Sequence, residues 1–576
     1  MSRWGRLAAL LLAAILGLTA CAAIPTGGSV GTSQATGGPN VSVPNANFNP
    51  QGPSQNDSPQ AIIHGFISAA VGVADSFQTA RKFLTPDVSN TWKGSDQTVV
   101  FRGEPRLSPP DSDGTYRVEV DVKATVDADG VMTRAPAGTQ ETWQYSMNQI
   151  NGQWRISELP QGILLEEGFF QSLFQSRNLY FYDPAFTVLV PDTRWFPSQR
   201  SPTQGNAIAT LIVKALLNGA APYLRGAVTS AFPESVKLLK DSVPVSDGQA
   251  VVDLTSQPLL EAGPDVQRKM QQQLFTSLQL AVGVNSVQMR ADQTPVTFPS
   301  EPEAPMNPPT AHAPIVDNRQ IGVSNDRLVW VENDSVSPVE GTPQFSAPPR
   351  YPAQSYARGS AVAFLSADLR TLYTVSAGES VLEQLSGVPL SPPSFGPDGW
   401  VWSAATDGSG RVFALKPGVI QKPLSFVVDW LKDRKVTSLK IARDGARALI
   451  VSSANGNGMV TVSGILKQDD AVGSAPQGFT DPQRFYPPEP VERALWTGES
   501  QMIVYQAGDG PIRPIELSLD ADPKQPTAIN DLRWLSVGNT VTSAYAQTAS
   551  GMIYARFGNS WNAAAFTGVA DLAFPG

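Results

Sequence analysis

Residues 397–402 read PDGWVW, a tight turn followed by an apolar run that fits a buried β-strand. The same phrase recurs in altered form as RDGARALI at residues 443–450, with weaker copies on both sides. The copies are anchored at Asp326, Asp368, Asp398, Asp444, Glu499 and Ser550. A repeat of about 40–50 residues with two or more strands per unit is typical of propeller blades. We predict an all-β propeller of six to seven blades over residues 318–576, with a β-sandwich as the alternative.

The spacing of these anchors is uneven. Asp368 and Asp398 are 30 residues apart, whereas the other neighbouring anchors are 42 to 55 residues apart. The short interval indicates either a shortened blade or an anchor assigned to the wrong turn. The last residues, 569–576, read VADLAFPG and resemble the opening of one more blade. We expect them to pair with the strands around residues 321–331, because closing the ring removes two exposed sheet edges.

The segment before the propeller, residues 178–298, mixes strand-like and helix-like patterns. LYFY at residues 179–182 predicts a strand, and LIVKALLNG at residues 211–219 predicts a helix that ends at its glycine. A hairpin pattern follows, and then a Gln-rich helix over residues 265–281 with apolar side chains at steps of four. This order resembles the GerMN domain of exported envelope proteins, which implies a small α+β fold.

The first folded segment, residues 58–177, begins with Ser58 and Pro59, a favourable cap and first turn for a helix. We expect one helix over residues 61–74 and a second over residues 76–84. Alternating apolar and polar residues then predict antiparallel strands joined by a hairpin turn. Helices followed by such a sheet favour an α+β domain of the NTF2-like cone type.

Four aromatic residues of that sheet are candidates for lining a ligand pocket, namely Tyr116, Trp143, Tyr145 and Trp154. A pocket for a cell-wall fragment would combine an apolar lining with a few polar groups. Filling of the domain core is the simpler interpretation of the same residues.

Residues 21–57 and 299–317 differ from the folded segments because they are rich in Pro and small polar residues. They predict a disordered tether and a Pro-rich linker, respectively. The tether contains GGSVG at residues 27–31, a match to the hydrolase pattern G-x-S-x-G. That chemistry needs a strand-to-helix turn and partner His and Asp residues. A tether offers neither, so we interpret the match as chance.

Cys21 is the only cysteine among 576 residues. Before it, residues 1–20 contain Arg3 and Arg6, an apolar run and small residues, the pattern of a secretory signal peptide. LTAC, residues 18–21, resembles the lipobox of bacterial lipoproteins. That resemblance implies cleavage before Cys21, which would become an N-acyl and S-diacylglycerol cysteine. An ordinary cleaved signal or a one-pass anchor is the alternative.

The composition argues against several classes of function. The net charge is −9, so nucleic acid, whose phosphates attract cationic proteins, is an unsuitable partner. The two histidines, His64 and His312, lie far apart in the sequence, which disfavours a zinc site or a Ser-His-Asp triad. Asp127 to Gly130 begin like a calcium loop without its later ligands, so a tight turn is favoured. We predict no catalytic residue, metal or cofactor.

Hydrolysis by paired carboxylates is the remaining enzymatic hypothesis. It needs several of Asp326, Asp368, Asp398 and Asp444 to converge in one propeller channel. Their position in repeated turns predicts the rims of the blades instead. Trp400, Trp402 and Trp496 are candidates for contacts with a partner, and packing between blades is their simpler interpretation.

Signal, tether, two α+β domains and propeller, in that order, resemble the actinobacterial lipoprotein LpqB family. LYFYDP at residues 179–184, LLNG at residues 216–219 and the Asp-Gly turns at residues 398–399 and 444–445 carry the resemblance. It implies a protein lipid-anchored on the extracytoplasmic face of the cell membrane. There it would be a non-enzymatic regulator of cell-envelope homeostasis and division that binds the extracellular domain of an MtrB-like sensor histidine kinase. An envelope hydrolase or a cell-wall-fragment binding protein is the alternative.

Overall fold

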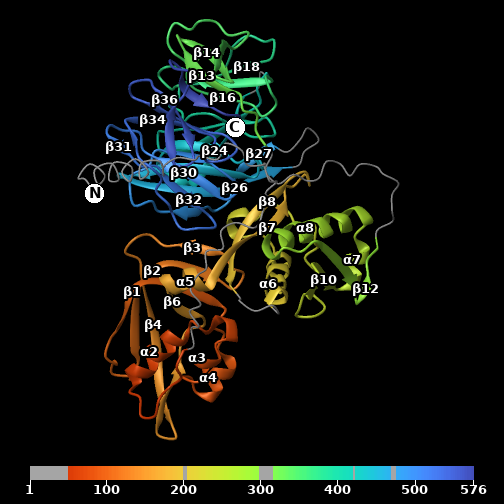
Figure 1. Ribbon diagram of the computed structural model, residues 1–576, viewed down its shortest axis with the longest axis vertical. Coiled ribbons are helices and arrows are strands. Elements are labelled where there is room, and N and C mark those ends of the chain that lie inside the picture. Colours follow the sequence, from red (N-terminus) through yellow and green to blue (C-terminus); the bar gives the residue numbers. More distant parts are fainter. Residues whose placement is uncertain (1–49, 199–203, 298–314, 419–421, 469–474) are drawn as a thin grey trace, which may run out of the picture. The chain divides into compact units, whose positions relative to one another are not determined.

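The computed structural model contains two α+β domains followed by an all-β propeller, which confirms the predicted fold class (Figure 1). The structure describes residues 50–198, 204–297, 315–418, 422–468 and 475–576. We call the three parts the N-terminal domain (50–173), the middle domain (174–297) and the propeller (315–576). Within the described residues, no helix combines the length and the apolar character needed to cross a membrane.

The N-terminal domain is a sheet covered by short helices. Its strand order is β5-β4-β2-β1-β6, with β3 beside β2, and all pairs are antiparallel except β1 with β6. The strands are β1 (Gln97–Leu107), β2 (Tyr116–Asp127), β3 (Met132–Arg134), β4 (Gln140–Ile150), β5 (Gln153–Glu158) and β6 (Ile163–Glu166). The helices are α2 (Pro59–Ala69), η1 (Gly72–Asp75), α3 (Gln78–Arg81), α4 (Pro86–Thr91) and α5 (Glu167–Leu173).

The first helix begins where the sequence predicts and ends early. The Ser58 hydroxyl accepts a hydrogen bond from the Ala61 amide at 3.2 Å, which caps the first turn. The prediction of a second helix over residues 76–84 is wrong, because Ser76 and Phe77 adopt left-handed φ angles of 58° and 63°. This bend brings the Phe77 ring within 5.6 Å of the Trp92 ring, and only the single turn α3 remains before α4. Packing of an aromatic side chain therefore outweighs helix continuity here.

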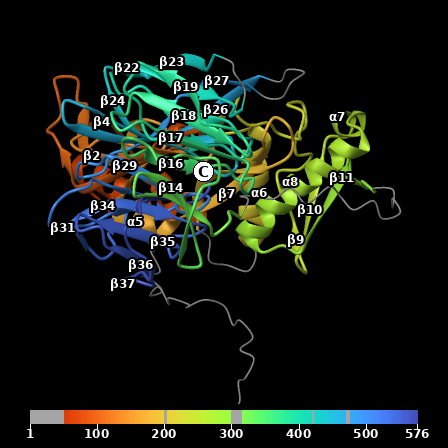
Figure 2. The same cartoon turned by 90° about the horizontal axis from the view of Figure 1, so that it is seen from above.

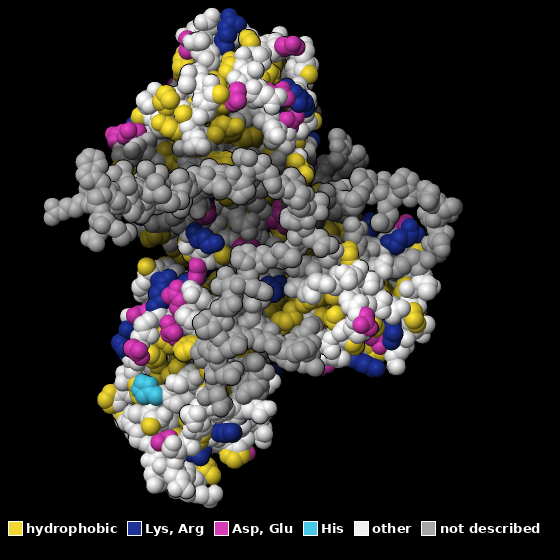
Figure 3. All heavy atoms as spheres, in the orientation of Figure 1, with side chains coloured by type: hydrophobic (Ala, Val, Ile, Leu, Met, Phe, Trp, Pro, Cys, Tyr) yellow, Lys and Arg dark blue, Asp and Glu magenta, His cyan; other side chains and the backbone are white. Residues whose placement is uncertain are grey.

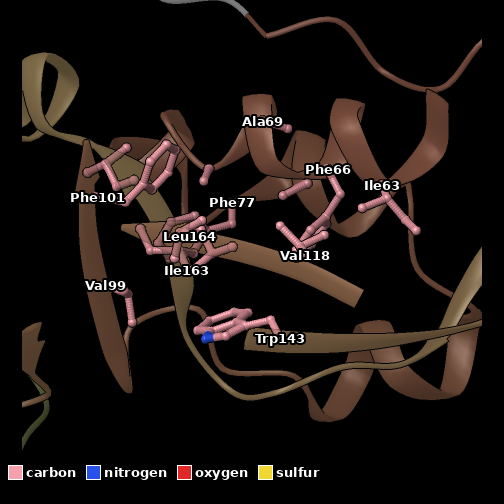
Figure 4. Close-up of a cluster of buried hydrophobic side chains, with 14 of the residues drawn as sticks. Ile63, Phe66, Ala69, Phe77, Val99, Phe101, Val118, Trp143, Ile163 and Leu164 are labelled. Atoms are coloured by element: carbon pink, nitrogen blue, oxygen red, sulfur yellow. The ribbon is translucent and has the colours of Figure 1, made fainter. Parts of the chain in front are cut away.

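The core of this domain lies between α2 and the sheet. Figure 4 shows Ile63 and Phe66 of α2 pointing toward side chains of the sheet, among them Val118 and Trp143. The hairpin turn between β4 and β5 forms as predicted, with positive φ at Asn151 and the glycine after it. Apolar burial on one face of a single sheet thus explains the alternation in the sequence.

The middle domain combines a ribbon, a small sheet and two longer helices. β7 and β8 form an antiparallel ribbon, and the second sheet has the order β12-β11-β10-β9 with β10 and β11 parallel. Helix α8 contacts β7 and β11 and buries Met270, Leu274 and Leu278. The helix predicted to stop at Gly219 does so, and that glycine has a φ of 95°.

The strands of the middle domain are β7 (Phe174–Tyr182), β8 (Leu189–Pro197), β9 (Val245–Ser246), β10 (Gln249–Leu254), β11 (Ser286–Ala291) and β12 (Thr294–Pro295). The helices are α6 (Gln204–Asn218), η2 (Pro222–Leu224), α7 (Ser256–Glu261) and α8 (Pro264–Val282). The Gln-rich helix expected over residues 265–281 is α8.

The described residues of the propeller form six blades, each an antiparallel sheet. Blade 1 is β38 (Ala570–Ala573), β13 (Gln320–Ser324), β14 (Arg327–Glu332) and β15 (Ser335–Pro338). Blade 2 is β16 (Arg350–Gln354), β17 (Ala361–Leu365), β18 (Thr371–Ser376) and β19 (Leu382–Ser386). Blade 3 is β20 (Ser394–Phe395), β21 (Val401–Ala404), β22 (Ser409–Leu415) and β23 (Leu424–Lys432).

The second half of the ring follows the same plan with more irregular outer strands. Blade 4 is β24 (Lys435–Ile441), β25 (Arg447–Ala454), β26 (Asn457–Gln468), β27 (Ala475–Phe479) and β28 (Gln483–Phe485). Blade 5 is β29 (Arg493–Trp496), β30 (Gln501–Tyr505) and β32 (Ile515–Ser518), beside the small pair β31 (Pro511–Ile512) and β33 (Ile529–Asn530). Blade 6 is β34 (Leu532–Val537), β35 (Ala544–Thr548), β36 (Ile553–Phe557) and β37 (Ser560–Ala563).

The ring closes as the sequence predicts. The innermost strand of each blade contacts the innermost strand of the next, in the circular order β38, β16, β20, β24, β29, β34 and back to β38. β38 pairs antiparallel with β13 through Ile321 opposite Ala573. A Cβ atom on Gly322 would overlap a methyl group of Val569 and lie 3.1 Å from the Ala570 carbonyl oxygen. Glycine at position 322 therefore permits the closing strand to approach. In Figure 2 the C-terminus and β16 lie near the middle of the propeller, and β23 and β37 lie at its periphery.

The short interval between two anchors has a simple structural cause. Asp368 lies in the turn between the second and third strands of blade 2, whereas Asp398 lies between the first and second strands of blade 3. The two anchors are thus in non-equivalent turns, and neither blade is shortened to two strands. The interpretation that an anchor was assigned to the wrong turn is confirmed.

Buried contacts join the propeller to the middle domain. Asp444 and Arg447 form an ion pair whose side chains are 3% and 2% exposed, and both lie near the buried Tyr223 of the middle domain. The Tyr180 hydroxyl donates to the Glu499 carboxylate at 2.9 Å. Tyr223 and Leu224 share one apolar cluster with blades 4 and 5, including Leu449 and Met502. The junction is therefore a continuous core.

Candidate functional site

The one predicted functional residue, Cys21, and two features to which the sequence analysis gave no function lie outside the part of the chain that the structure describes. The two features are the GGSVG match at residues 27–31 and His312. His64 is described, and its side chain is exposed on α2. The lipid-attachment site therefore stays a prediction from the sequence.

The aromatic residues predicted for a pocket in the N-terminal domain are packed in its core. Tyr116, Trp143 and Tyr145 are 8%, 3% and 0% exposed, and Trp154 packs against the same cluster. Burial raises the pKa of the Tyr145 hydroxyl well above its ordinary value. The Trp143 indole donates to a Glu141 carboxylate oxygen at 2.8 Å. These side chains therefore fill the core of the N-terminal domain and do not line a ligand pocket.

The three candidate tryptophans of the propeller have different environments. Trp402 is 1% exposed and packs against Phe426 and Phe479. Trp496 is 8% exposed and donates to the Lys440 carbonyl at 3.2 Å. Trp400 is half-buried beside the Lys416 ammonium group, which lies 5.2 Å from its ring centre. Packing within the propeller thus accounts for Trp402 and Trp496.

The four turn aspartates do not converge on one channel. Asp326 and Asp368 lie between second and third strands, whereas Asp398 and Asp444 lie between first and second strands, at the opposite ends of their blades. Three of them accept backbone hydrogen bonds two residues ahead: Asp368 from Arg370, Asp398 from Trp400 and Asp444 from Ala446. They stabilise turns, as carboxylates in such positions commonly do.

The expected tight turn at residues 127–130 is also present. The Asp127 carboxylate accepts from the amides of Asp129 and Val131 at 3.0 and 2.8 Å, and Gly130 has a φ of 80°. Among the described residues, no group of three or more His, Cys, Asp or Glu side chains is placed to hold a metal ion.

Two cavities that the sequence did not reveal lie along the axis of the propeller. The larger, about 570 Å³, is lined by residues at the beginnings of the inner strands, including Arg350, Arg493, Arg533 and Trp534. The smaller, about 60 Å³, is lined by the later residues of the inner strands and includes Lys440. Trp534 borders both cavities.

Cationic groups outnumber carboxylates in the lining of this axis, since five Lys and Arg side chains line the two cavities together with Glu492 and Asp571. Burial and the neighbouring Arg493 lower the pKa of the Lys440 ammonium group to about 8. Burial lowers the pKa of Arg350, but the adjacent Asp571 outweighs it and raises that pKa overall. Asp571 accepts from the Arg350 Nε at 3.0 Å and from the Tyr351 amide at 3.1 Å. Anions are therefore the ligands that this axis favours.

The larger cavity opens on the propeller face that is turned away from the middle domain. Four of the six inner strands begin at this cavity, and β29 runs from it to the turn that contains Glu499; the turn that contains Asp444 follows the equivalent end of β24. Those turns contact the middle domain through Tyr223 and Tyr180. Because each inner strand spans the propeller from face to face, the cavity and the junction lie on opposite faces.

Comparison with known proteins places all three domains. A family model described as the N-terminal domain of lipoprotein LpqB matches residues 52–171, and one described as the LpqB β-propeller domain matches residues 326–573. A third, described as sporulation and spore germination, matches residues 178–297. The chain belongs to the LpqB lipoprotein family.

LpqB proteins of other actinobacteria match most of the chain. The LpqB of Bifidobacterium longum is 27% identical, over 73% of this chain and 72% of its own length. That of Streptomyces coelicolor is 25% identical, over 89% and 88%, respectively. A chain in a crystal structure of a nidogen/laminin complex is 9% identical with a TM-score of 0.32, covering 44% of this chain and 97% of its own. As a member of the LpqB family, this protein is a membrane-anchored envelope lipoprotein.

A third cavity, of about 120 Å³, lies where the N-terminal domain of this LpqB family member meets blades 4 and 5. Lys123 forms ion pairs there with Glu167 at 2.5 Å and with Asp522 of the propeller at 2.7 Å. The Arg134 guanidinium lies 4.4 Å from the Phe485 ring centre and donates to the Ser518 carbonyl. These contacts hold the N-terminal domain against the propeller.

Figure 3 shows the charged side chains of one face of the molecule. Basic and acidic groups are interspersed there, and neither sign forms an extended field. This distribution gives no support to a nucleic-acid partner.

Proposed function

We propose that this protein is held by lipid on Cys21 at the extracytoplasmic face of the membrane. There it acts as a non-enzymatic accessory to an MtrB-like sensor histidine kinase in envelope homeostasis and division. The contact is made with the extracellular domain of the kinase. Two or more acyl chains make such anchoring stable. A tether of the predicted length then raises the effective concentration of the folded part beside a membrane receptor.

The observation that carries this proposal is the buried junction between the domains. Tyr223 packs in one apolar core with blades 4 and 5, near the buried Asp444–Arg447 ion pair. The Tyr180 hydroxyl donates to Glu499 across the same boundary. A surface held rigid before binding loses less conformational entropy when a partner docks. Domains that are packed together and attached to a tether suit a protein that binds a partner at the membrane.

The side chains considered for catalysis also support this proposal. Asp368, Asp398 and Asp444 are engaged in turns, and the last is paired with Arg447. The aromatic residues considered for a wall-fragment pocket in the N-terminal domain pack in its core. No observation favours a second function in that domain.

The test is capture of the kinase from native membranes. The full chain carries an affinity tag, and cells are treated with a crosslinker before the membranes are solubilised. We expect the wild type to recover a sensor histidine kinase and Cys21→Ala, which cannot be lipidated, to recover much less. The variant Ser29→Ala is the matched control, because it changes one small residue of the same tether and removes the hydrolase-like pattern.

Two further measurements distinguish binding of a kinase from catalysis. The Cys21→Ala protein should still bind the isolated extracellular domain of the kinase in solution, because its folded part is unchanged. Capture of no kinase by the wild type would contradict the proposal. Hydrolysis of a wall polymer by the soluble Cys21→Ala protein, without capture of a kinase by the wild type, would favour the hydrolase hypothesis instead.

A further inference from the structure

The large cavity at the open face of the propeller has the features of a built ligand site. We call it the arginine pocket and define it by Arg350, Arg493, Arg533, Tyr351 and Trp534. Its volume of about 570 Å³ lies within the range of small-molecule sites, about 300–1,000 Å³. It is formed by the first residues of four inner strands, β16, β29, β34 and β38, so the closed ring fixes its shape.

Arg493 is held firmly in the lining of this pocket. Its guanidinium carbon lies 4.7 Å from the ring centre of Tyr351 and 5.0 Å from that of Trp534. Those two rings are themselves stacked, with centres 5.0 Å apart and an interplanar angle of 16°. Nη2 of Arg493 donates to the Tyr351 hydroxyl at 3.0 Å. The side chain is thus oriented before any ligand arrives.

Arg493 forms no ion pair among the described residues, in contrast to its two neighbours, although Glu492 and Asp571 also line the pocket. Arg350 is paired with Asp571 at 3.0 Å, and Arg533 with Asp509, whose side chain is 88% exposed. Nη1 of Arg493 is buried and has no hydrogen-bond partner in the described part of the chain. A guanidinium keeps its charge in proteins, and a buried donor without a partner is costly.

An oxyanion satisfies both deficits at once. A carboxylate or phosphate oxygen accepts from the free Nη1 and supplies the missing negative charge, and such charge-assisted bonds are among the strongest in proteins. Arg533 can add a second contact, because its present partner, Asp509, is a solvent-exposed carboxylate that holds it weakly. A neutral ligand would leave the charge of Arg493 unbalanced.

We propose that the arginine pocket binds the oxyanion of a small carboxylate or phosphate ligand, with Arg493 as the principal contact and Arg533 as the second. The pocket opens away from the junction with the middle domain, so a ligand reaches it without separating the domains. This inference does not rest on the proposed kinase partner, because the site is complete within the propeller.

The test is calorimetric titration of the full chain in detergent at low salt. The probes are inorganic phosphate, an N-acetylated tripeptide with a free C-terminal carboxylate, and the C-terminal amide of that tripeptide. We expect saturable binding of at least one of the two anions and none of the amide. Binding of phosphate alone assigns a phosphate group to the natural ligand, and binding of the peptide acid alone assigns a carboxylate.

Three variants locate the site. Arg493→Gln should weaken the binding of the anion by about tenfold or more, because it removes a charge-assisted bond. Arg533→Gln should weaken it less, and it serves also if the first variant folds poorly, since its side chain lies at the exposed rim. Arg411→Gln, which removes an arginine paired with Asp407 in blade 3, is the matched control and should bind like the wild type.

The proposal is overturned by any of three results. These are the lack of saturable binding of either anion to the wild type, equal binding of the peptide amide and the acid, and wild-type affinity in both Arg493→Gln and Arg533→Gln. Thermal unfolding of each variant confirms that the propeller is intact, so that a change of affinity reports on the pocket.

Discussion

Replacing Arg447 by Met should destabilise the propeller beside its junction with the middle domain. Arg447 binds the Asp444 carboxylate through Nε at 2.8 Å and Nη2 at 2.6 Å, and it donates to the Glu499 carbonyl at 2.7 Å. The side chains of the ion pair are only 2% and 3% exposed. The variant therefore leaves the Asp444 carboxylate buried without its cation.

The expected magnitude follows from that burial. Breaking a buried ion pair by removing one partner costs about 3–5 kcal/mol, because the remaining charge is uncompensated. For a folding unit of the size of the propeller, 1 kcal/mol corresponds to about 2–4 °C in Tm. We expect Arg447→Met to lower the Tm of the propeller by about 6–20 °C.

Thermal and urea unfolding of the full chain, followed by circular dichroism, measure this change. The matched control is Arg358→Met, which breaks an ion pair with Glu332 whose side chains are 53% and 38% exposed. Such exposed pairs contribute about 0–1 kcal/mol. The double variant Asp444→Leu, Arg447→Met should recover much of the stability, because it removes the buried charge as well.

Two outcomes would refute the reasoning. The first is a loss of stability in Arg447→Met no larger than that in Arg358→Met. The second is a double variant that is no more stable than Arg447→Met, because this would show that the orphaned Asp444 carboxylate is not the cause of the loss.

Three other predictions concern the ring, its axis and the N-terminal core. Gly322→Ala should lower the free energy of unfolding by about 1–3 kcal/mol, because the new methyl group forces β13 away from β38. Gly458→Ala should cost less, because the nearest atoms would lie at an ordinary 3.4 Å. Limited proteolysis at the C-terminus should cleave the first variant faster than the second. Burial lowers the pKa of Lys440 to about 8, so between about pH 8 and pH 10 the unfolded chain binds a proton that the folded chain has lost. The free energy of unfolding therefore rises with pH in this window. Lys440→Met should remove that rise in urea titrations, and an unchanged rise would contradict the lowered pKa. Trp143→Ala should cost about 3–5 kcal/mol and the half-buried Trp154→Ala less, since only the first vacates the core; equal losses would speak against core filling.

The fold was largely predictable because its elements repeat local patterns. The Asp-Gly turns at residues 398 and 444 each precede an apolar strand, and residues 569–576 resemble the opening of one more blade. The number of blades was less certain, because equivalent phrases occur in turns at both ends of a blade. Asp368 and Asp398 carry similar turn chemistry in non-equivalent turns, and only the strand pairing distinguishes them.

The helices of the N-terminal domain show where local patterns fail. Residues 76–84 have a helix-like composition, but the left-handed backbone of Ser76 and Phe77 is stabilised by contact of Phe77 with Trp92. That contact joins residues whose proximity no local pattern reports. Tertiary packing therefore overrides propensity in this segment.

The arginine pocket could not be found from the sequence alone. Arg350, Arg493 and Arg533 are far apart in the chain and belong to three different blades. One signal was present, because each arginine stands at or next to the first residue of an inner strand. That signal gains meaning only once the ring is closed and the inner strands are known to begin on one face.

The central claim is that this protein works from the membrane surface through lipid on Cys21. Mass spectrometry of the native protein isolated from the membrane fraction tests it most directly. We predict an N-terminal peptide that starts at Cys21 and carries both the diacylglyceryl and the N-acyl group. A Cys21 thiol without lipid, in protein recovered from the cytosolic fraction, would contradict the account.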